Sequence, residues 1–389
     1  MQPAAHLSTG AFALRAALFY AALFAISGIQ MPFFPVWLAS AGLDSREIGI
    51  VLATPLMVRI IAVPVVTAMA DRASALRESL ILAALVGGAA MAAFGFVTGF
   101  AAVFIVSVVI ALGYTPMVPI ADAYVFKGLP ERSYGLVRLW GSVSFIVATG
   151  IGGLFIDIFP VRDLIWLLVA AFAVTAVTAI RLPPRPRLHV AVADAPPAPA
   201  LLRDRTFVFV ILAASLTQAS HGFYYAFSGL DWRGAGFDGV VIGLLWSVGV
   251  VAEIVLFALS PYLPKGAGPT VLLLIGAGGA ALRWGLMAVS LPGFLLPFIQ
   301  MLHGLSFGAT YLGAVGFIAR AAPDRLAATA QGYLSTAGGI AMAVTMSLGG
   351  ALYAPGGHRG YALMAVTAIA ACAFACIAHR SVLRSAFRA

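Results

Sequence analysis

Runs of about 20 or more apolar residues, separated by short breaks that contain charges, prolines or glycines, fill most of the chain. A helix needs about 20 apolar residues to cross a bilayer, because each residue adds about 1.5 Å along its axis. The alternating pattern of membrane β-barrel strands is not seen. The chain is therefore predicted to be an all-α membrane protein with twelve transmembrane helices, at residues 12–38, 46–68, 79–98, 100–126, 138–158, 161–180, 207–229, 238–260, 270–290, 292–319, 327–353 and 361–379.

A polar segment at residues 181–206 divides the twelve predicted helices into two groups of six. Its sequence, RLPPRPRLHVAVADAPPAPALLRDRT, contains prolines and charges that exclude a membrane span. We therefore expect two pseudo-symmetric six-helix bundles, residues 1–180 and 207–389, joined by this segment as a cytoplasmic linker.

The two halves are also related in sequence. Residues 41–60 (AGLDSREIGIVLATPLMVRI) align with residues 235–254 (AGFDGVVIGLLWSVGVVAEI) at an offset of 194, and six of the twenty positions are identical. Each copy is a loop that leads into the second helix of its half. This equal position favours a parallel repeat about an axis normal to the membrane, in which the substrate binds near the membrane midplane between the halves.

Composition and charge agree with this architecture. Hydrophobic residues make up 62% of the chain and charged residues 10%, against about 25% charged residues in soluble proteins. The net charge of +9 reflects topology, because seventeen of 23 Lys and Arg residues lie in predicted cytoplasmic segments, four outside and two within spans. Both termini are expected in the cytoplasm, and no nucleic-acid partner is expected.

Four charged residues lie well inside predicted spans, and a fifth lies near the start of the fifth span. A charge at bilayer depth costs at least about 2.5–3.5 kcal/mol, so it usually faces a partner or a water-filled cavity. One pair occupies equivalent positions of the repeat, so the two halves carry opposite charges in the same place. The residues are Arg59 and Glu253, which form that pair, together with Asp122, Arg283 and Arg138.

Glu253 is the strongest candidate for a proton carrier. It lies in LWSVGVVAEIVLF with no other charge nearby, and a carboxylate that alternates between a dry environment and a nearby cation can load and release a proton. Arg283 is the expected cation, and His303 can relay a proton or donate a hydrogen bond. The alternative is a structural bridge between Glu253 and Arg283. For Asp122, which follows two prolines, proton coupling and structural pairing with Arg138 or Arg59 are equally supported.

Several polar and aromatic residues are candidate substrate contacts. The aromatic side chains could stack on a ring, although Trp and Tyr also gather at membrane interfaces, and a lone helical histidine is often a packing residue. The candidates are Gln30, His221, Tyr225, Trp246 and Tyr311, in addition to Arg138 and Arg59.

Motifs of enzymes and metal sites are missing. There is no GxxxxGK[ST] phosphate loop and no cluster of metal ligands. Cys372 and Cys376 share one helix face, where a packing role is expected rather than a metal or redox role. We therefore expect no enzyme activity, no metal and no cofactor other than a proton gradient as the energy source.

Twelve spans, a central linker and paired halves resemble the major facilitator superfamily. The loop AMADRASALR (68–77) is similar to a reduced form of its Gly-x-x-x-Asp-Arg-x-Gly-Arg-Arg gating motif, with Asp71, Arg72 and Arg77 in place. Almost the whole chain resembles the bacterial 3-phenylpropionic acid permease group, near the lactose permease-like carriers, through YGLVRLWGSVSFI (134–146), HGFYYAFSGLDWRGAGF (221–237), LLWSVGVVAEIVLFALS (244–260) and LRWGLMA (282–288).

This resemblance implies proton symport. Carriers of the lactose-permease type place charged or titratable residues on helices four, five, eight, nine and ten, as this chain does with Asp122, Arg138, Glu253, Arg283 and His303. They also carry a second acid after the histidine, where this chain has Ser306. Glu253 is therefore favoured as the proton site.

The function predicted from the sequence is a monomeric proton symporter in the bacterial cytoplasmic membrane that imports a small organic solute by alternating access. An aromatic carboxylate is the leading substrate, because surplus arginine suits an anion. The alternatives are a sugar or nucleoside symporter and a drug or metabolite exporter. A non-transporting membrane receptor or scaffold is disfavoured.

Overall fold

The computed structural model describes residues 9–73, 75–126, 128–129, 131–184, 198–264, 266–289, 291–323 and 326–386. Within these ranges the chain is helical and contains no β-strand. Twelve helical segments of the described chain are long and apolar enough to cross a membrane. The prediction of an all-α membrane protein with twelve transmembrane helices is confirmed.

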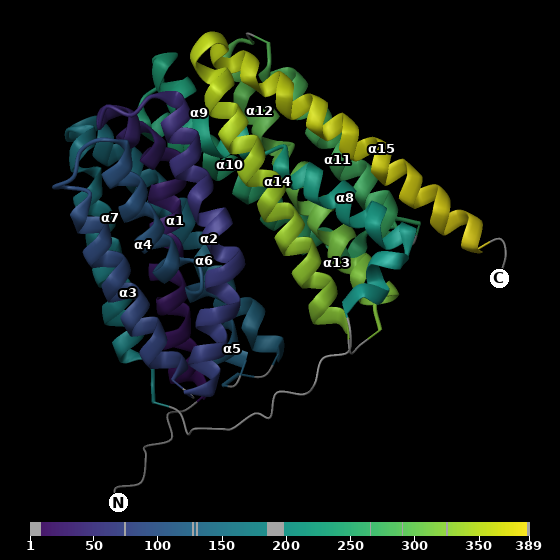
Figure 1. Cartoon of the computed structure of the whole chain (residues 1–389), viewed down its shortest axis with the longest axis horizontal. Coiled ribbons are helices and arrows are strands. Elements are labelled where there is room, and N and C mark those ends of the chain that lie inside the picture. The colour runs from purple at the N-terminus through teal and green to yellow at the C-terminus, as the bar shows by residue number, and fades with distance from the viewer. Residues whose placement is uncertain are drawn as a thin grey trace, which may run out of the picture. The chain divides into compact units, whose positions relative to one another are not determined.

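Most spans are built on one continuous α-helix (Figure 1). Short 3₁₀ turns, such as η1 (Val161–Asp163) and η3 (Ser260–Tyr262), lie at some of their ends. The continuous helices are α1 (Thr9–Ser40), α2 (Ser45–Arg72), α3 (Leu76–Ala93), α6 (Glu131–Ile158), α7 (Leu164–Arg181), α10 (Gly239–Leu259), α11 (Pro269–Met287), α14 (Ala327–Gly356) and α15 (Tyr361–Ala386).

The fourth, seventh and tenth spans are interrupted. The fourth consists of α4 (Phe100–Tyr114) and α5 (Met117–Phe126), and the break falls at Pro116, as its missing N–H requires. The seventh and tenth spans break without a proline at the junction: α8 (Arg205–Ala219) is followed by α9 (Gly222–Gly234), and α12 (Leu296–Met301) is joined to α13 (Thr310–Ala321) by a π-helix, η5 (Gly304–Ala309).

Most ends of the spans lie close to the predicted ones. Two helices extend further than expected, because α6 begins at Glu131 and α15 ends at Ala386, and one helix is shorter. The third helix was expected to continue to residue 98, but α3 ends at Ala93. The chain turns over residues 94–97, and Gly99 then adopts a φ of 80°, which an L-residue with a side chain rarely adopts. The predicted end was too late because the residues of this turn are also apolar, so the hydrophobic run in the sequence continues beyond the end of the helix. Of the predicted linker, residues 185–197 lie outside the described residues, and Ala198–Arg203 form the 3₁₀ turn η2.

The chain divides into two compact units. Unit 1 contains residues 1–44, 57–191 and 232–244, and unit 2 contains residues 45–56, 192–231 and 245–389. Each unit therefore consists mainly of one half of the chain. Unit 1 also includes the first turns of α10, and unit 2 the first turns of α2. Both segments belong to the two copies of the sequence repeat.

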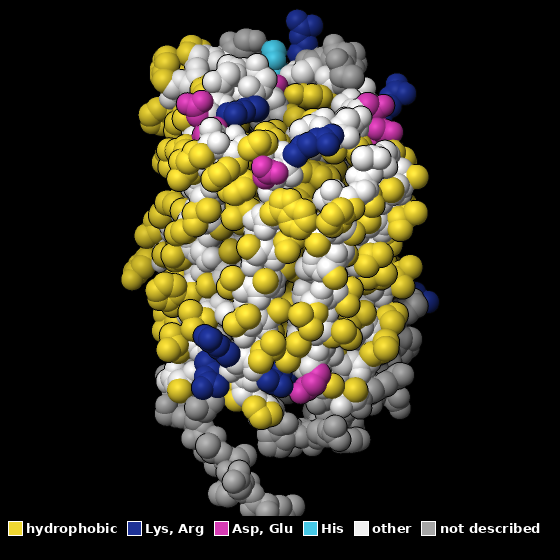
Figure 2. Space-filling model, turned by 90° about the vertical axis from the view of Figure 1, so that its left-hand side faces the viewer, with side chains coloured by type: hydrophobic (Ala, Val, Ile, Leu, Met, Phe, Trp, Pro, Cys, Tyr) yellow, Lys and Arg dark blue, Asp and Glu magenta, His cyan; other side chains and the backbone are white. Residues whose placement is uncertain are grey.

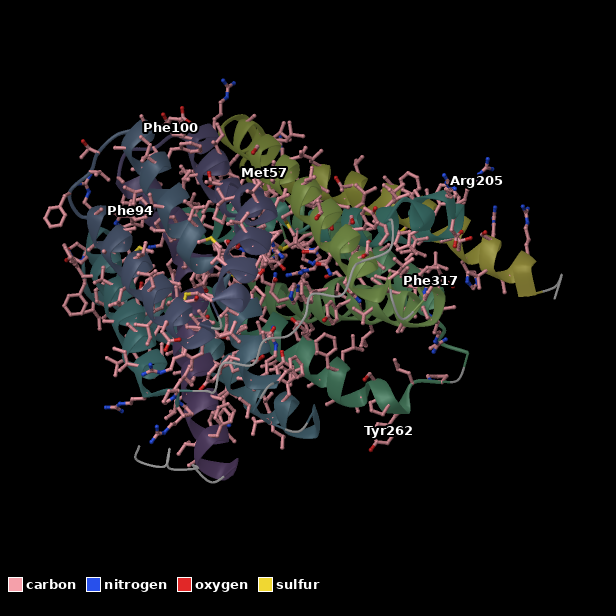
Figure 3. All side chains as sticks on the ribbon, turned by 60° about the horizontal axis from the view of Figure 1, so that its bottom comes forward. Met57, Phe94, Phe100, Arg205, Tyr262 and Phe317 are labelled. Carbon is pink, nitrogen blue, oxygen red and sulfur yellow. The ribbon has the colours of Figure 1, made fainter. Side chains whose placement is uncertain are left out.

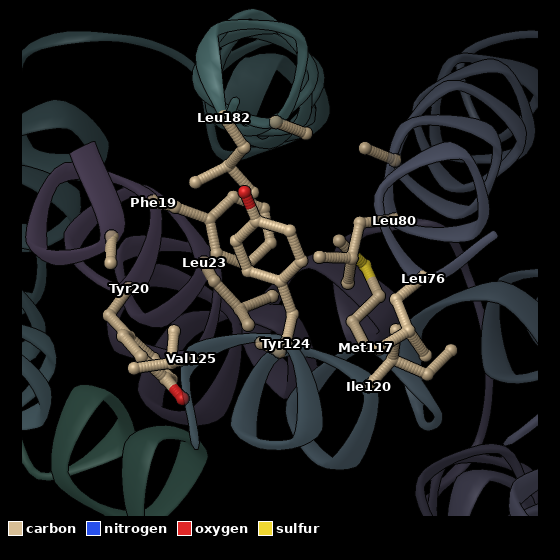
Figure 4. Packing of buried hydrophobic residues seen from close by; sticks show 14 of the residues in the cluster. Phe19, Tyr20, Leu23, Leu76, Leu80, Met117, Ile120, Tyr124, Val125 and Leu182 are labelled. Atoms are coloured by element: carbon tan, nitrogen blue, oxygen red, sulfur yellow. The ribbon is translucent and has the colours of Figure 1, made fainter. Parts of the chain in front are cut away.

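The core of unit 1 is packed mainly by α1, α3, α5 and the end of α7 (Figure 4). Phe19 and Leu23 of α1 meet Tyr124 of α5, whose ring is almost completely buried and whose hydroxyl donates to the carbonyl of Pro183 at 2.6 Å. Tyr20 is buried on the adjacent face of α1. The packing of this core fixes Tyr20, whose hydroxyl can then hold the polar side chain of Asp122 at the edge of the core.

The core of unit 2 uses smaller residues. Ala213 and Ala214 of α8 pack with Ala375 of α15, and α15, the yellow helix of Figure 1, lies along α11 and α8. A Cβ at Gly276 of α11 would collide with the Thr310 hydroxyl. Small residues let membrane helices approach closely, where van der Waals contact replaces the hydrophobic effect as the driving force.

The outer surface is that of a membrane protein. In Figure 2, hydrophobic side chains cover the middle of the visible face, and charged side chains gather toward its two ends. Large apolar residues such as Ile61 and Leu136 are exposed, as lipid contact allows. Tyr262, 82% exposed, projects from the end of its span (Figure 3), where an amphipathic ring suits the membrane interface.

Candidate substrate and proton site

The break between α8 and α9 fixes the first part of the site, in unit 2. The last carbonyl groups of α8 lack helical partners, and side chains take their place. Thr345 of α14 donates to the Ala219 carbonyl at 2.6 Å, and Ser220 donates to the Thr217 carbonyl at 2.6 Å. Gly222 leaves room for Thr345, because a Cβ there would collide with the Thr345 hydroxyl. His221 is thereby held, completely buried, at the break.

The π-helix of the tenth span fixes the second part. It follows His303, and π-helical turns occur frequently at functional sites. Its glycines allow α10 to approach, since a Cβ at Gly304 would lie 2.8 Å from the Ala252 carbonyl oxygen and one at Gly308 would lie 2.8 Å from Leu256. This close approach brings Glu253 of α10 to 3.8 Å from His303 Nε2.

Arg283 of α11 lies at the centre of these elements and is 0% exposed. Its Nη2 donates to Gln300 Oε1 at 2.5 Å, and its Nη1 donates to His303 Nδ1 at 2.8 Å, with Ser306 Oγ at 3.5 Å. The guanidinium also interacts with the Tyr224 hydroxyl.

Aromatic rings complete the surroundings of the guanidinium. It lies 4.6 Å from the ring centroid of Tyr224 and 4.4 Å from that of Trp284, positions in which a ring face attracts a cation.

The hydrogen bonds assign the protons on both histidines. A guanidinium only donates, so His303 Nδ1 must be the acceptor and its proton lies on Nε2, facing Glu253. His221 Nδ1 faces the carbonyls of Thr217 and Gln218, so it carries a proton, and His221 Nε2 is hydrogen-bonded to Ser306 Oγ at 3.1 Å. His303 is therefore neutral in this arrangement, and its contact with Glu253 is not an ion pair.

The cation and the acid of this cluster are consequently separated. Among the described residues, the hydrogen-bond partners of Arg283 are neutral, whereas Glu253, with a side chain 22% exposed, contacts His303. The direct bridge between Glu253 and Arg283, the alternative interpretation of the sequence, is replaced by a histidine-mediated contact. Three buried donors near the cluster, Arg283 Nε, Trp246 Nε1 and the Tyr361 hydroxyl, have no hydrogen-bond acceptor.

The predicted aromatic contacts divide into two environments. Trp246 is buried and stacks on Tyr224 and Tyr225, with centroids 4.7 and 5.8 Å apart. Tyr311 is half exposed and lies beside Phe257. The first group therefore belongs to the Arg283 cluster, and Tyr311 lies on an accessible surface of unit 2.

A second polar cluster lies in unit 1 around Asp122 of α5. Its Oδ1 accepts from the hydroxyl groups of Tyr20 at 2.5 Å and Tyr134 at 2.9 Å, and from Arg138 Nη1 at 3.0 Å. The Arg138 guanidinium lies 5.4 Å from the ring centroid of Phe24. Of the two partners expected for Asp122, the structure pairs it with Arg138.

Two other predicted residues belong to unit 1. Arg59 has an exposed position on α2 and Gln30 is partly exposed on α1.

The side chains of Asp71 and Arg72 lie outside the described residues. Arg77, from the same loop, donates to the carbonyls of Leu182 and Ile180 at 2.6 Å each. It therefore satisfies the free carbonyl groups at the end of α7. No group of three or more metal-ligating side chains that could hold a metal ion is found among the described residues.

Sequence reasoning missed Gln300, Tyr20 and Tyr134. Gln300 lies three residues before His303, a spacing that places both on one helix face, so the polar pair was a usable signal. Tyr20 lies 102 residues from Asp122, and nothing in the sequence connects them.

Comparison with known families defines the class of protein. The model of the MFS_1 like family matches residues 13–363. The chain belongs to this family of the major facilitator superfamily. It is a membrane transporter and not an enzyme.

Relatives and solved structures agree with the family. The chain is 30% identical to the "Probable 3-phenylpropionic acid transporter" of Escherichia coli strain K12, over 91% of this chain and 95% of that protein. It is 27% identical to the maltose permease of Geobacillus stearothermophilus, over 82% of each chain. The crystal structure of the nucleoside transporter NupG has the same fold, with a TM-score of 0.83, 16% identity and coverage of 95% of this chain and 98% of that chain.

The Asp122 cluster leads to a prediction about stability. Replacing Asp122 by Asn leaves the Arg138 cation without its counter-ion, whereas replacing Arg138 by Gln leaves Asp122 with two tyrosine donors. We expect Asp122→Asn to cost more, about 1–3 kcal/mol, and the double variant to cost less than the sum of the two. Thermal unfolding in detergent measures this, and strictly additive losses would contradict the pairing.

Proposed function

We propose that the protein is a proton-coupled symporter that takes up a small organic carboxylate by alternating access, and that an aromatic carboxylate is its first candidate substrate. The observation that carries this proposal is the buried Arg283 guanidinium, whose hydrogen-bond partners among the described residues are neutral. The proton gradient then supplies the energy.

An unneutralised cation away from water is costly, by several kcal/mol. A substrate carboxylate is the natural counter-ion, because the guanidinium fork matches carboxylate geometry. Arg283 Nε, a donor on one edge of the fork, is buried without an acceptor. Because Arg283 is fully buried, a local opening of the cluster must precede binding.

The rings around Arg283 favour an aromatic substrate. Tyr224 and Trp284 flank the guanidinium, and Trp246 with Tyr225 continues the aromatic group. A planar substrate could insert beside these faces with its carboxylate at Arg283. The relative from E. coli, 30% identical, is named as a transporter of 3-phenylpropionic acid, an aromatic carboxylate.

Glu253 is the proposed proton carrier, and His303 the proposed link to the substrate. When a carboxylate takes Arg283 Nη1, His303 Nδ1 loses its donor and becomes a free proton acceptor. The bound carboxylate also adds a negative charge, which a proton on Glu253 or His303 cancels. Substrate and proton would therefore be bound together, as symport requires.

A nucleoside is the second candidate substrate. The NupG fold matches closely, and the neutral polar groups of Gln300, Ser306 and His221 could bind hydroxyl groups while the rings stack on a base. This candidate gives the Arg283 charge no counter-ion, and for that reason we rank it second.

We further propose a bacterial cytoplasmic membrane location with both termini in the cytoplasm, since seventeen of the 23 Lys and Arg residues then lie on the cytoplasmic side. Reporter fusions at the two ends measure this orientation. A fluorescent reporter that folds only in the cytoplasm should be bright at both ends, and a periplasmic phosphatase should be inactive there. An active phosphatase at either end would contradict the orientation.

The role of Glu253 can be measured in proteoliposomes. Adding 3-phenylpropionate outside should make the external medium alkaline in the parent, because protons enter with the substrate. In Glu253→Gln this signal should fall to that of protein-free liposomes, while exchange of labelled for unlabelled substrate continues. Glu78→Gln is the matched control, since Glu78 is an exposed acid at the start of α3 paired with Arg77. Full proton uptake by Glu253→Gln would refute the assignment.

The carboxylate preference can be measured by ligand-induced thermal stabilisation. The parent should be stabilised by 3-phenylpropionate more than by 3-phenylpropanamide, which has the same shape without the charge. Arg283→Gln should bind the acid at least about tenfold more weakly, because a hydrogen bond to a charged group contributes about 1.5–3 kcal/mol. Arg283→Lys should bind weakly too, since it lacks the fork.

Arg320→Gln, an exposed arginine at the end of α13, is the control and should behave as the parent. Equal affinity of Arg283→Gln for the acid would overturn the carboxylate assignment. Stabilisation of the parent by uridine and not by the acid would favour the nucleoside candidate.

A further inference from the structure

Unit 1 contains residues 232–244 from the second half of the chain, and the Asp157 carboxylate of the first half binds this segment. Asp157, at the end of α6, accepts from Arg233 Nη1 at 2.8 Å and from the backbone N–H groups of Gly239 at 2.8 Å and Val240 at 3.0 Å. The three donors come from the end of α9 and the start of α10, and Asp157 lies 76 residues or more before them. All four residues belong to unit 1.

The contact has a clear physical basis. Gly239 and Val240 are the first residues of α10, so their N–H groups have no acceptor inside the helix. A negative charge is favoured at this end of a helix dipole. Asp157 therefore caps the start of α10 from α6, a helix far away in the sequence, whereas a capping side chain usually precedes its helix directly. Arg233 neutralises the charge of the Asp157 carboxylate.

Glycines let the two helices cross closely beneath Asp157. A Cβ at Gly153 would collide with the Gly239 carbonyl, and one at Gly243 would lie 2.7 Å from the Thr149 carbonyl oxygen. Thr149, Gly153 and Asp157 are spaced by four residues and so lie on one face of α6. Few side chains interlock across such a glycine-lined contact, so it can separate easily once the bonds to Asp157 are released.

The related crossing in unit 2 lacks this charge. There Gly49 of α2, which corresponds to Gly243 in the repeat, meets Gly350 of α14, and a Cβ at Gly350 would collide with the Ser45 carbonyl. The sequence of α14 contains no Asp or Glu. The helix that corresponds to α6 at this crossing therefore has no acid in the place of Asp157.

We propose that Asp157 is a gating residue, whose carboxylate holds α6 and α10 together in one state of the transport cycle and must release Arg233 and the start of α10 for the crossing to open. The proposal rests on the alternating access proposed above. It concerns an equilibrium between closed and open states of the protein, so it can be tested without a substrate.

The test uses a cysteine that the crossing covers. Ile156 is buried, and its side chain lies 2.7 Å from the position of a Cβ on Gly239. Ile156→Cys is made in a background where Cys372 and Cys376 are serine, and its reaction with a maleimide is timed in nanodiscs, where both membrane faces are accessible. Asp157→Ala should react about tenfold faster than the parent, equivalent to about 1.4 kcal/mol in the opening equilibrium.

Two further variants sharpen the result. Arg233→Gln should accelerate the reaction less than Asp157→Ala, because the two backbone N–H bonds to Asp157 remain. Asp163→Asn, which removes an acid from the nearby turn η1, should leave the rate unchanged.

A reporter at Ala84, buried in the core of unit 1, separates gating from general loosening of the fold. Ala84→Cys should react equally slowly with and without Asp157. Unchanged labelling at position 156 in Asp157→Ala would overturn the proposal, as would equal acceleration at position 84. Neither result bears on Glu253 or Arg283, so a failure here is distinguishable from a failure of the proposed substrate and proton sites.

Discussion

Every backbone N–H and carbonyl inside a bilayer must find a partner in the protein, because lipid offers none. A continuous helix meets this demand by itself, so most spans of this transporter are single helices. Where a helix is interrupted, side chains must complete the hydrogen bonds. Thr345 and Ser220 do so at the break between α8 and α9, and Asp157 does so at the start of α10. The polar residues with the clearest functional potential lie at or beside such places.

The buried Arg283 follows from the same constraint. Its neighbours, His303 and Gln300, come from the span that contains the π-helix, and His221 comes from the broken seventh span. These interruptions turn polar side chains toward α11, and the hydrogen bond from Arg283 fixes His303 as a neutral tautomer. The cation is thus held by dipoles and rings. The acid, Glu253, remains separate and partly accessible.

The two halves share an ancestry in sequence but differ in their polar chemistry. In unit 1 the acid Asp122 receives three donors and is paired directly with Arg138. In unit 2 the acid and the cation are kept apart by a histidine. The crossings formed by the two repeat copies also differ, since α6 provides the Asp157 carboxylate and α14 contains no acid.

The sequence by itself determined the membrane class, the twelve spans, the repeat and the residues whose charge is unusual in lipid, because length and hydropathy fix what a bilayer accepts. It placed Glu253, Arg283 and His303 on successive helices, and it left Arg138 and Arg59 as alternative partners of Asp122. It could not show that Arg283 binds Gln300 rather than Glu253, that Tyr20 reaches Asp122, or that Asp157 caps α10. These contacts join residues 17 to 102 positions apart, and only the packing of glycine-lined helices decides which side chains meet.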